Sequence, residues 1–196
     1  MKRYIKATAL LLVLCTLLAS AGCAGSPEKE ESAKDLTYPT FTFTHYASGG
    51  VPEEYEAVIL FEQSNSTFTA YQVAFASCTC RDPMNNYMSV AYVEILNNRD
   101  SASEASVRYI TFGEYKGLFG DGNRDVEDFT EPHVNETFVS KLIGKTYEDL
   151  ESWGGYGSVM EGFDVDALTG ATVTTSNITS MLLSLMKYHT EKYYKE

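Results

Sequence analysis

The feature that most limits the possible folds is the order of the sequence patterns, in which strand-like runs come first and one amphipathic helix comes last. Residues 40–45 alternate threonine with aromatic side chains, the period-two pattern of a half-buried strand. Residues 56–62 and 67–76 are rich in β-branched and aromatic side chains, and the short polar turn between them predicts a hairpin. Residues 88–96 and 106–112 predict a second hairpin. We therefore expect a mainly antiparallel sheet of about four or five strands.

The C-terminal part of the chain carries an apolar pattern with helical spacing. The positions recur at intervals of three and four residues and comprise Ile178, Met181, Leu182, Leu185, Met186 and His189. Directly before them, Thr174, Thr175 and Ser176 are candidates for the helix N-cap. Strands that precede helices in the chain predict an α+β fold, in which this C-terminal helix packs on one face of the sheet.

Shorter helices are predicted between the sheet and the C-terminal helix. Residues 137–143 and 146–152 have the expected pattern, and Gly144 separates them. The glycine- and aspartate-rich residues 113–130 predict a surface loop. Residues 153–157, Trp-Gly-Gly-Tyr-Gly, predict a flexible turn that carries two aromatic rings.

The chain begins with the pattern of a bacterial export signal. Basic residues at the start precede an apolar run over residues 7–19, which is too short to be read as a membrane span. Residues 20–23, Ser-Ala-Gly-Cys, resemble a lipobox, in which the cysteine is lipidated and becomes the new N-terminus. Ser20 stands where that pattern usually has Leu, Val or Ile. Ordinary signal cleavage nearby is therefore the alternative.

These patterns predict that the chain is divided into three parts. Residues 1–22 are predicted to be a lipoprotein signal peptide, and residues 23–36 a flexible tether with few apolar side chains. Residues 37–196 are long enough to form one domain with its own core. We expect an exported protein that is anchored to the outer face of the cell membrane by lipidated Cys23.

The mature protein is expected to be strongly acidic. The chain has 15 Lys and Arg, three of which leave with the signal, against 27 Asp and Glu, so the formal charge becomes −15. Such a surface repels nucleic acids and anionic lipid headgroups. We therefore expect no nucleic-acid partner and a membrane attachment through the lipid anchor only.

Cys78 and Cys80 are the two thiols that remain in the mature domain. In an extended segment, both side chains lie on one face, with Cα atoms near the upper limit for a disulfide. A bridge would close a tiny loop, stabilise little and be easily reduced, which leads to the hypothesis of a labile redox pair. Small buried side chains, or a bridge without function, are the alternative. With two thiols and only three histidines, we predict no metal site.

The most specific motif lies just before the C-terminal helix. Residues 166–172 read Asp-Ala-Leu-Thr-Gly-Ala-Thr. Gly170 and Ala171 have little side-chain bulk, so their backbone N–H groups can approach a phosphate closely. The N-terminus of the following helix adds further N–H groups and the positive end of its dipole. Thr172 ends the motif with a hydroxyl group, which is a poor nucleophile. If a phosphate group were esterified to this hydroxyl, a separate enzyme would have to catalyse the reaction.

The heptad resembles Asp-x-x-(Ser/Thr)-Gly-Ala-Thr, the acceptor motif of FMN-binding domains, in which a flavin transferase esterifies the FMN phosphate to the last threonine. The resemblance implies an α+β domain that carries FMN covalently on Thr172 and passes electrons from a membrane donor to an external acceptor, without catalytic residues of its own. Trp153 or Tyr156 could stack on the flavin ring. The other cofactor-binding positions would be Asp166, Thr169, Gly170, Ala171, Thr174 and Thr175.

Two other functions compete with the electron carrier. An extracellular flavin-dependent reductase would turn over one specific acceptor, but the sequence shows no cluster of acid, base and nucleophile for that purpose. A flavin-free thiol redox or ligand-binding lipoprotein would use Cys78 and Cys80. A carrier is favoured because an ester bond keeps the flavin from diffusing away outside the cell.

Overall fold

The computed structural model describes residues 37–79, 87–97, 101–113, 115, 130–158 and 171–194. Residues from Tyr38 to Glu196 belong to one compact unit of the chain. The signal peptide and tether expected over residues 1–36 lie outside the described residues, and Cys23 lies there with them. Most of the loop expected at 113–130 also lies outside them.

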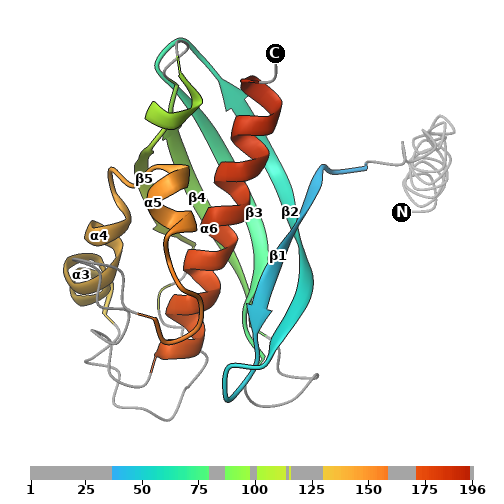
Figure 1. Cartoon of the computed structure of the whole chain (residues 1–196), viewed down its shortest axis with the longest axis vertical. Helices are drawn as coiled ribbons and strands as arrows, with labels where there is room; N and C mark the ends of the chain where they lie inside the picture. Colours follow the sequence, from blue (N-terminus) through green and yellow to red (C-terminus); the bar gives the residue numbers. More distant parts are fainter. Residues whose placement is uncertain are drawn as a thin grey trace, which may run out of the picture. The chain divides into compact units, whose positions relative to one another are not determined.

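The described strands form one antiparallel sheet in which each strand pairs with the next along the chain (Figure 1). Both expected hairpins are present. The strands are β1 (Thr40–Tyr46), β2 (Pro52–Ser64), β3 (Phe68–Cys78), β4 (Tyr87–Leu96) and β5 (Val107–Phe112). Between β4 and β5, the single helical turn η2 covers Ala102–Glu104.

The strand β2 is longer than the sequence pattern predicts. β2 was expected to begin at residue 56, but it begins at Pro52, which pairs with Tyr46 at the end of β1. Glu53 and Glu54 are exposed, so the hydrophobic pattern carries no signal over this part of the strand. The strand extends back to Pro52 because these residues pair with β1. The strands join through a turn in which Gly49 and Gly50 have φ values of 81° and 79°, a region that glycine tolerates best.

A continuous helical segment follows the sheet and is made of α3 (Glu131–Val134), the π-helical turn η4 (Asn135–Val139) and α4 (Ser140–Leu142). The sequence predicted only its second half. The helix α5 (Tyr147–Glu151) has its expected place. It begins with a capping box, in which the Thr146 hydroxyl accepts from the Asp149 N–H and the Asp149 carboxylate accepts from the Thr146 N–H.

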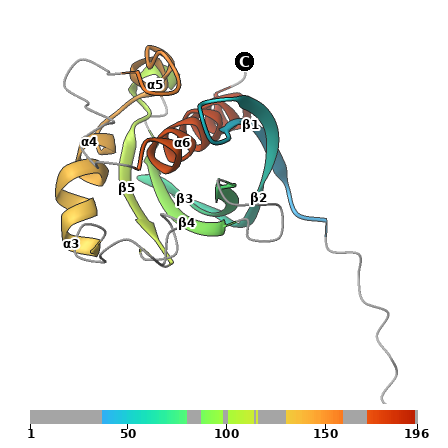
Figure 2. The ribbon, with the colours of Figure 1, turned by 90° about the horizontal axis from the view of Figure 1, so that it is seen from below.

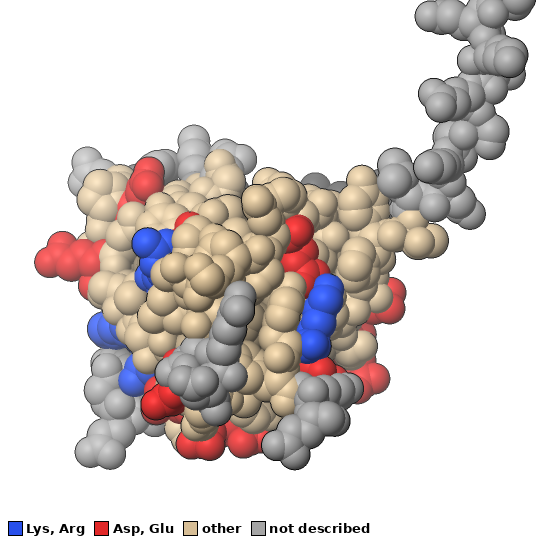
Figure 3. All heavy atoms as spheres, turned by 90° about the horizontal axis from the view of Figure 1, so that it is seen from above, with Lys and Arg blue, Asp and Glu red and all other residues tan. Residues whose placement is uncertain are grey.

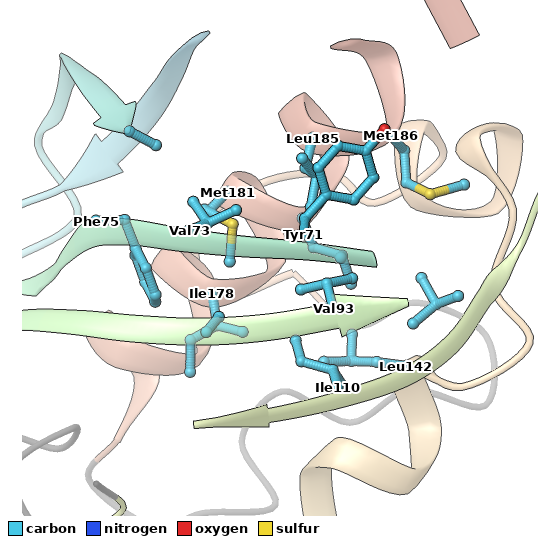
Figure 4. Packing of buried hydrophobic residues seen from close by; sticks show 14 of the residues in the cluster. Tyr71, Val73, Phe75, Val93, Ile110, Leu142, Ile178, Met181, Leu185 and Met186 are labelled. Atoms are coloured by element: carbon cyan, nitrogen blue, oxygen red, sulfur yellow. The ribbon is translucent and has the colours of Figure 1, made fainter. Parts of the chain in front are cut away.

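The C-terminal helix α6 (Thr172–Tyr193) packs on the concave face of the sheet, as expected for this α+β fold (Figure 2). Its neighbours in the sheet are chiefly β1 and β3. Figure 4 shows the core between the two layers, where Ile178, Met181 and Leu185 of α6 meet Val73 and Phe75 of β3. All six apolar helix positions expected from the sequence are buried. Their burial supplies much of the free energy that holds the two layers together.

The C-terminal half of α6 contains a buried histidine. The His189 side chain is fully buried, and its Nδ1 shares a hydrogen bond of 2.8 Å with the hydroxyl of Tyr71 on β3. Burial lowers the pKa of His189 from 6.5 to about 4, because the charged ring would lose its hydration. The imidazole is therefore neutral in the folded protein at neutral pH.

We predict that acidification destabilises the fold through His189. The unfolded chain binds a proton on this side chain below about pH 6.5, whereas the folded chain does so only near pH 4. The free energy of unfolding should therefore fall by up to about 3 kcal/mol across this interval. Urea denaturation at several pH values, compared with His189→Gln, measures the effect. An equally steep pH dependence in the variant would contradict the assignment.

Candidate functional site

The acceptor candidate Thr172 is the first residue of α6. Its side chain is partly exposed, and Ala171 before it is buried and occupies the N-cap position. Among the described residues, no side chain caps this end of the helix. The expectation that Thr174, Thr175 or Ser176 would be the cap is therefore wrong. The helix starts earlier than they suggested, and all three are buried in its first turns.

The position of the first helical hydrogen bond determines which backbone N–H groups at the start of α6 lack an acceptor within the helix. The Thr175 N–H donates to the Ala171 carbonyl at 3.0 Å, and the Thr175 hydroxyl contacts the same carbonyl at 3.1 Å. The N–H groups of Val173 and Thr174 precede this bond and have no acceptor within the helix itself. The start of α6 therefore presents amide donors together with the positive end of the helix dipole.

Asp166, Thr169 and Gly170 lie outside the described residues, so of the expected cofactor-binding positions only Ala171, Thr172, Thr174 and Thr175 have a described location.

Asn177 connects the start of α6 to two strands of the sheet. Its Oδ1 accepts a hydrogen bond from the Tyr46 N–H at 2.6 Å, and its Nδ2 donates to the Tyr46 carbonyl at 3.1 Å and to the Ser77 carbonyl at 3.0 Å. The side-chain amide thus pairs with the edge of β1 as another strand would, and it also reaches the end of β3. Asn177 is fully buried. It fixes the helix about 7.5 Å along its axis from Thr172.

Aromatic rings gather around Tyr46 on the same side of the fold. The Tyr46 ring lies 6.1 Å from that of Trp153 and 5.6 Å from that of Tyr156, measured between centroids. Glycine permits this packing. A Cβ atom added to Gly50 would lie 2.4 Å from the Tyr156 ring, and one added to Gly155 would lie 3.0 Å from the Tyr46 hydroxyl. Burial raises the pKa of Tyr46, against the effect of a hydrogen bond with the Tyr156 backbone.

The two aromatic candidates for flavin stacking differ in exposure. Trp153 is only 6% exposed and belongs to the core cluster, whereas Tyr156 is partly exposed. Tyr156 is therefore the better placed of the two to meet a ligand, and Trp153 serves to support the ring of Tyr46.

Several buried polar atoms near the start of α6 have no hydrogen-bond partner among the described residues. They are both ring nitrogens of His45, the Trp153 Nε1 and the Ser176 Oγ. His45 stacks on Tyr55 with ring centroids 4.4 Å apart, and burial lowers its pKa. A buried polar group without a partner costs about 1 to 3 kcal/mol. Such groups concentrate where a ligand or bound water would satisfy them.

The expected cysteine pair is only half described. Cys78 is buried at the end of β3, next to Ser77, whose carbonyl accepts from Asn177. Cys80 lies outside the described residues, so the structure does not test the disulfide hypothesis. The position of Cys78 does place one thiol on the same side of the fold as Tyr46.

Sequence reasoning missed the polar residues that organise this end of the fold. Asn177 sits within an apolar helical pattern, and His45 continues the inward alternation of Phe41 and Phe43 along β1. A polar residue in a core-facing position was the signal that could have identified both of them.

Other kinds of site find no support in the described segments. They contain no group of three or more His, Cys, Asp or Glu side chains that could share a metal ion. Their helices include none that combines the length and apolar character needed to cross a bilayer. Comparisons with family models, curated proteins and solved structures found no match to this chain.

We predict that Asn177 is the main polar attachment of the start of α6 to the sheet. Asn177→Ala would remove the partners of the Tyr46 N–H and carbonyl, and we expect a loss of about 3 kcal/mol in the free energy of unfolding. Asn135→Ala is a suitable control because Asn135 accepts one side-chain hydrogen bond, from Tyr115. Urea denaturation compares the two. Equal losses would show that Asn177 has no special role.

Proposed function

We propose that the protein is a lipid-anchored extracytoplasmic flavoprotein that carries FMN through a phosphoester to Thr172 and transfers electrons between a membrane donor and an external acceptor. The observation that carries the proposal is the position of Thr172. The last residue of an acceptor-like heptad is also the partly exposed first residue of a 22-residue helix.

The local electrostatics suit an esterified phosphate. A phosphodiester has one negative charge, and the start of α6 offers backbone donors and a favourable dipole, with no side-chain cap from the described part of the chain. Gly170 and Ala171 add little bulk beside the hydroxyl. An anion at this position would be held by neutral amide groups, which is consistent with a surface rich in acidic residues.

The surroundings also suit a planar heteroaromatic ring. Tyr156 offers a partly exposed ring beside Tyr46, and such a ring can stack on the planar face of a flavin. Tyr156 would hold and orient the ring, and Tyr46 would support it from behind. Bound FMN supplies the capacity to accept and donate one or two electrons.

A carrier explains these features better than an enzyme with its own substrate. Burial lowers the pKa of His45 and so opposes a role as a charged acid at neutral pH. The Tyr46 phenol is held protonated by the same effect. An ester bond together with a lipid anchor would keep both the cofactor and the protein at the membrane surface, where a flavin transferase and an electron donor are the partners required.

We predict that flavin attachment depends on the hydroxyl at position 172. When the protein is produced together with a flavin transferase, the denatured chain should show flavin fluorescence and an FMN adduct on the peptide that contains Thr172. Thr172→Ala should abolish both signals, and Thr172→Ser should retain them because a hydroxyl remains.

Thr190→Ala is the matched control, since Thr190 lies near the other end of the same helix. It should be labelled like the parent protein. Covalent flavin that persists in Thr172→Ala would disprove the proposed bond. A colourless parent protein, purified from its native host, would instead favour the thiol redox alternative.

We also predict that Cys23 is the lipid attachment site. Cys23→Ser should release the protein from the membrane fraction, because the acidic domain has no electrostatic attraction for anionic lipids. Fractionation followed by immunoblotting measures the distribution. A variant that stays in the membrane fraction after a high-salt wash would argue against the anchor without affecting the flavin assignment.

A further inference from the structure

A pocket of about 370 Å³ lies at the opposite end of α6 from Thr172. Three separate segments of the chain converge on it: the turn between β2 and β3, the residue after β4, and the end of α6. Its lining consists of Ser64, Asn65, Asn97, Tyr193 and Tyr194. The pocket is about 30 Å from the proposed flavin site along the helix axis, so it is independent of that site.

The amide side chains of the pocket are held in fixed orientations. Asn97 Nδ2 donates to the Ser64 hydroxyl at 3.1 Å and to the Asn65 carbonyl at 2.9 Å, while Asn97 Oδ1 accepts from Thr69 at 2.9 Å. Asn65 Oδ1 accepts from two backbone N–H groups of its own turn, at 2.7 and 2.9 Å. No group in the described chain accepts a hydrogen bond from the Asn65 NH₂ group, so it can donate to a ligand.

The aromatic wall of the pocket is also held in place. The Tyr193 hydroxyl donates to Glu62 at 2.6 Å, and its ring packs against His189 with centroids 5.0 Å apart. Tyr194 also packs against His189, at 5.9 Å. Tyr193 nevertheless remains 39% exposed. Two rings are thus anchored from behind and keep part of their surface available to a ligand.

Among the described residues that line the pocket, none carries a charged side chain. In the described part of the chain, the charged groups beside Tyr193 form an ion pair, in which Lys192 Nζ lies 2.7 Å from the Glu62 carboxylate. Figure 3 looks onto this end of the domain, and most of the surface visible there is neither acidic nor basic. The described lining therefore offers a ligand neutral hydrogen-bonding groups and aromatic rings rather than a charged partner.

We infer that this pocket binds a neutral saccharide. A sugar ring combines apolar C–H faces, which pack on aromatic rings, with hydroxyl groups that bond to amides and hydroxyls at fixed positions. The lining supplies both kinds of partner, already ordered, and its volume falls in the range of small-molecule sites. The source of the saccharide is either a free oligosaccharide or a glycan polymer at the cell surface.

The test is titration of the isotope-labelled full chain, in a zwitterionic detergent, with maltose, cellobiose and N,N′-diacetylchitobiose. NMR shifts are followed at the amides of the pocket residues. Saturable shifts there for at least one sugar are expected. Co-sedimentation with insoluble cellulose or chitin then separates the two sources, since a polymer-directed site pulls down the protein and a site for free sugars does not.

Two variants and a control locate the binding. Asn65→Asp keeps the acceptor oxygen that holds the turn but removes the NH₂ donor, and Tyr193→Ala removes one ring. Each should weaken binding at least about tenfold. Tyr109→Ala, which removes a tyrosine of β5 that is 47% exposed, should leave affinity unchanged. Absence of saturable shifts up to about 20 mM sugar, or full affinity in Asn65→Asp, would overturn the inference.

Discussion

The burial of α6 against a curled antiparallel sheet is the interaction on which the rest of this structure depends. An antiparallel sheet of neighbouring strands has one apolar face, and the sheet alone cannot bury this face from water. α6 covers that face with Ile178, Met181 and Leu185, and the two layers share one core. Because the helix comes last in the chain, this contact joins the C-terminal segment to β1 at the beginning of the domain.

The same helix changes character along its length. Its first turns bury polar residues, among them Thr175, Ser176 and Asn177, whereas its middle is apolar and its end carries tyrosines. Buried polar groups are costly unless they are bonded. Asn177 is fully satisfied by strand backbone, but Ser176 is not satisfied by any described residue. Buried polar groups without a partner lower stability, and proteins tend to keep them where a function requires them.

The helix α6 therefore contributes residues to two separate proposed sites, one at each of its ends. Its first residue is the proposed flavin attachment point, and its last residues form the wall of the polar pocket. The core between them contains the Tyr71–His189 pair and the aliphatic side chains of Figure 4. This separation would let the proposed flavin end exchange electrons while the proposed pocket meets a ligand, with no residue shared between the two.

The sequence by itself determined the fold class, the approximate strands and the apolar face of α6, because alternation and helical spacing are local patterns that burial imposes. It also determined the heptad that ends at Thr172. Only the tertiary structure decided that α6 starts before the expected caps, that β2 extends to Pro52, and that Asn177 pairs with β1. These features depend on partners that are distant in the chain, as Asn177 and Tyr46 are, and a local pattern contains no information about a distant partner.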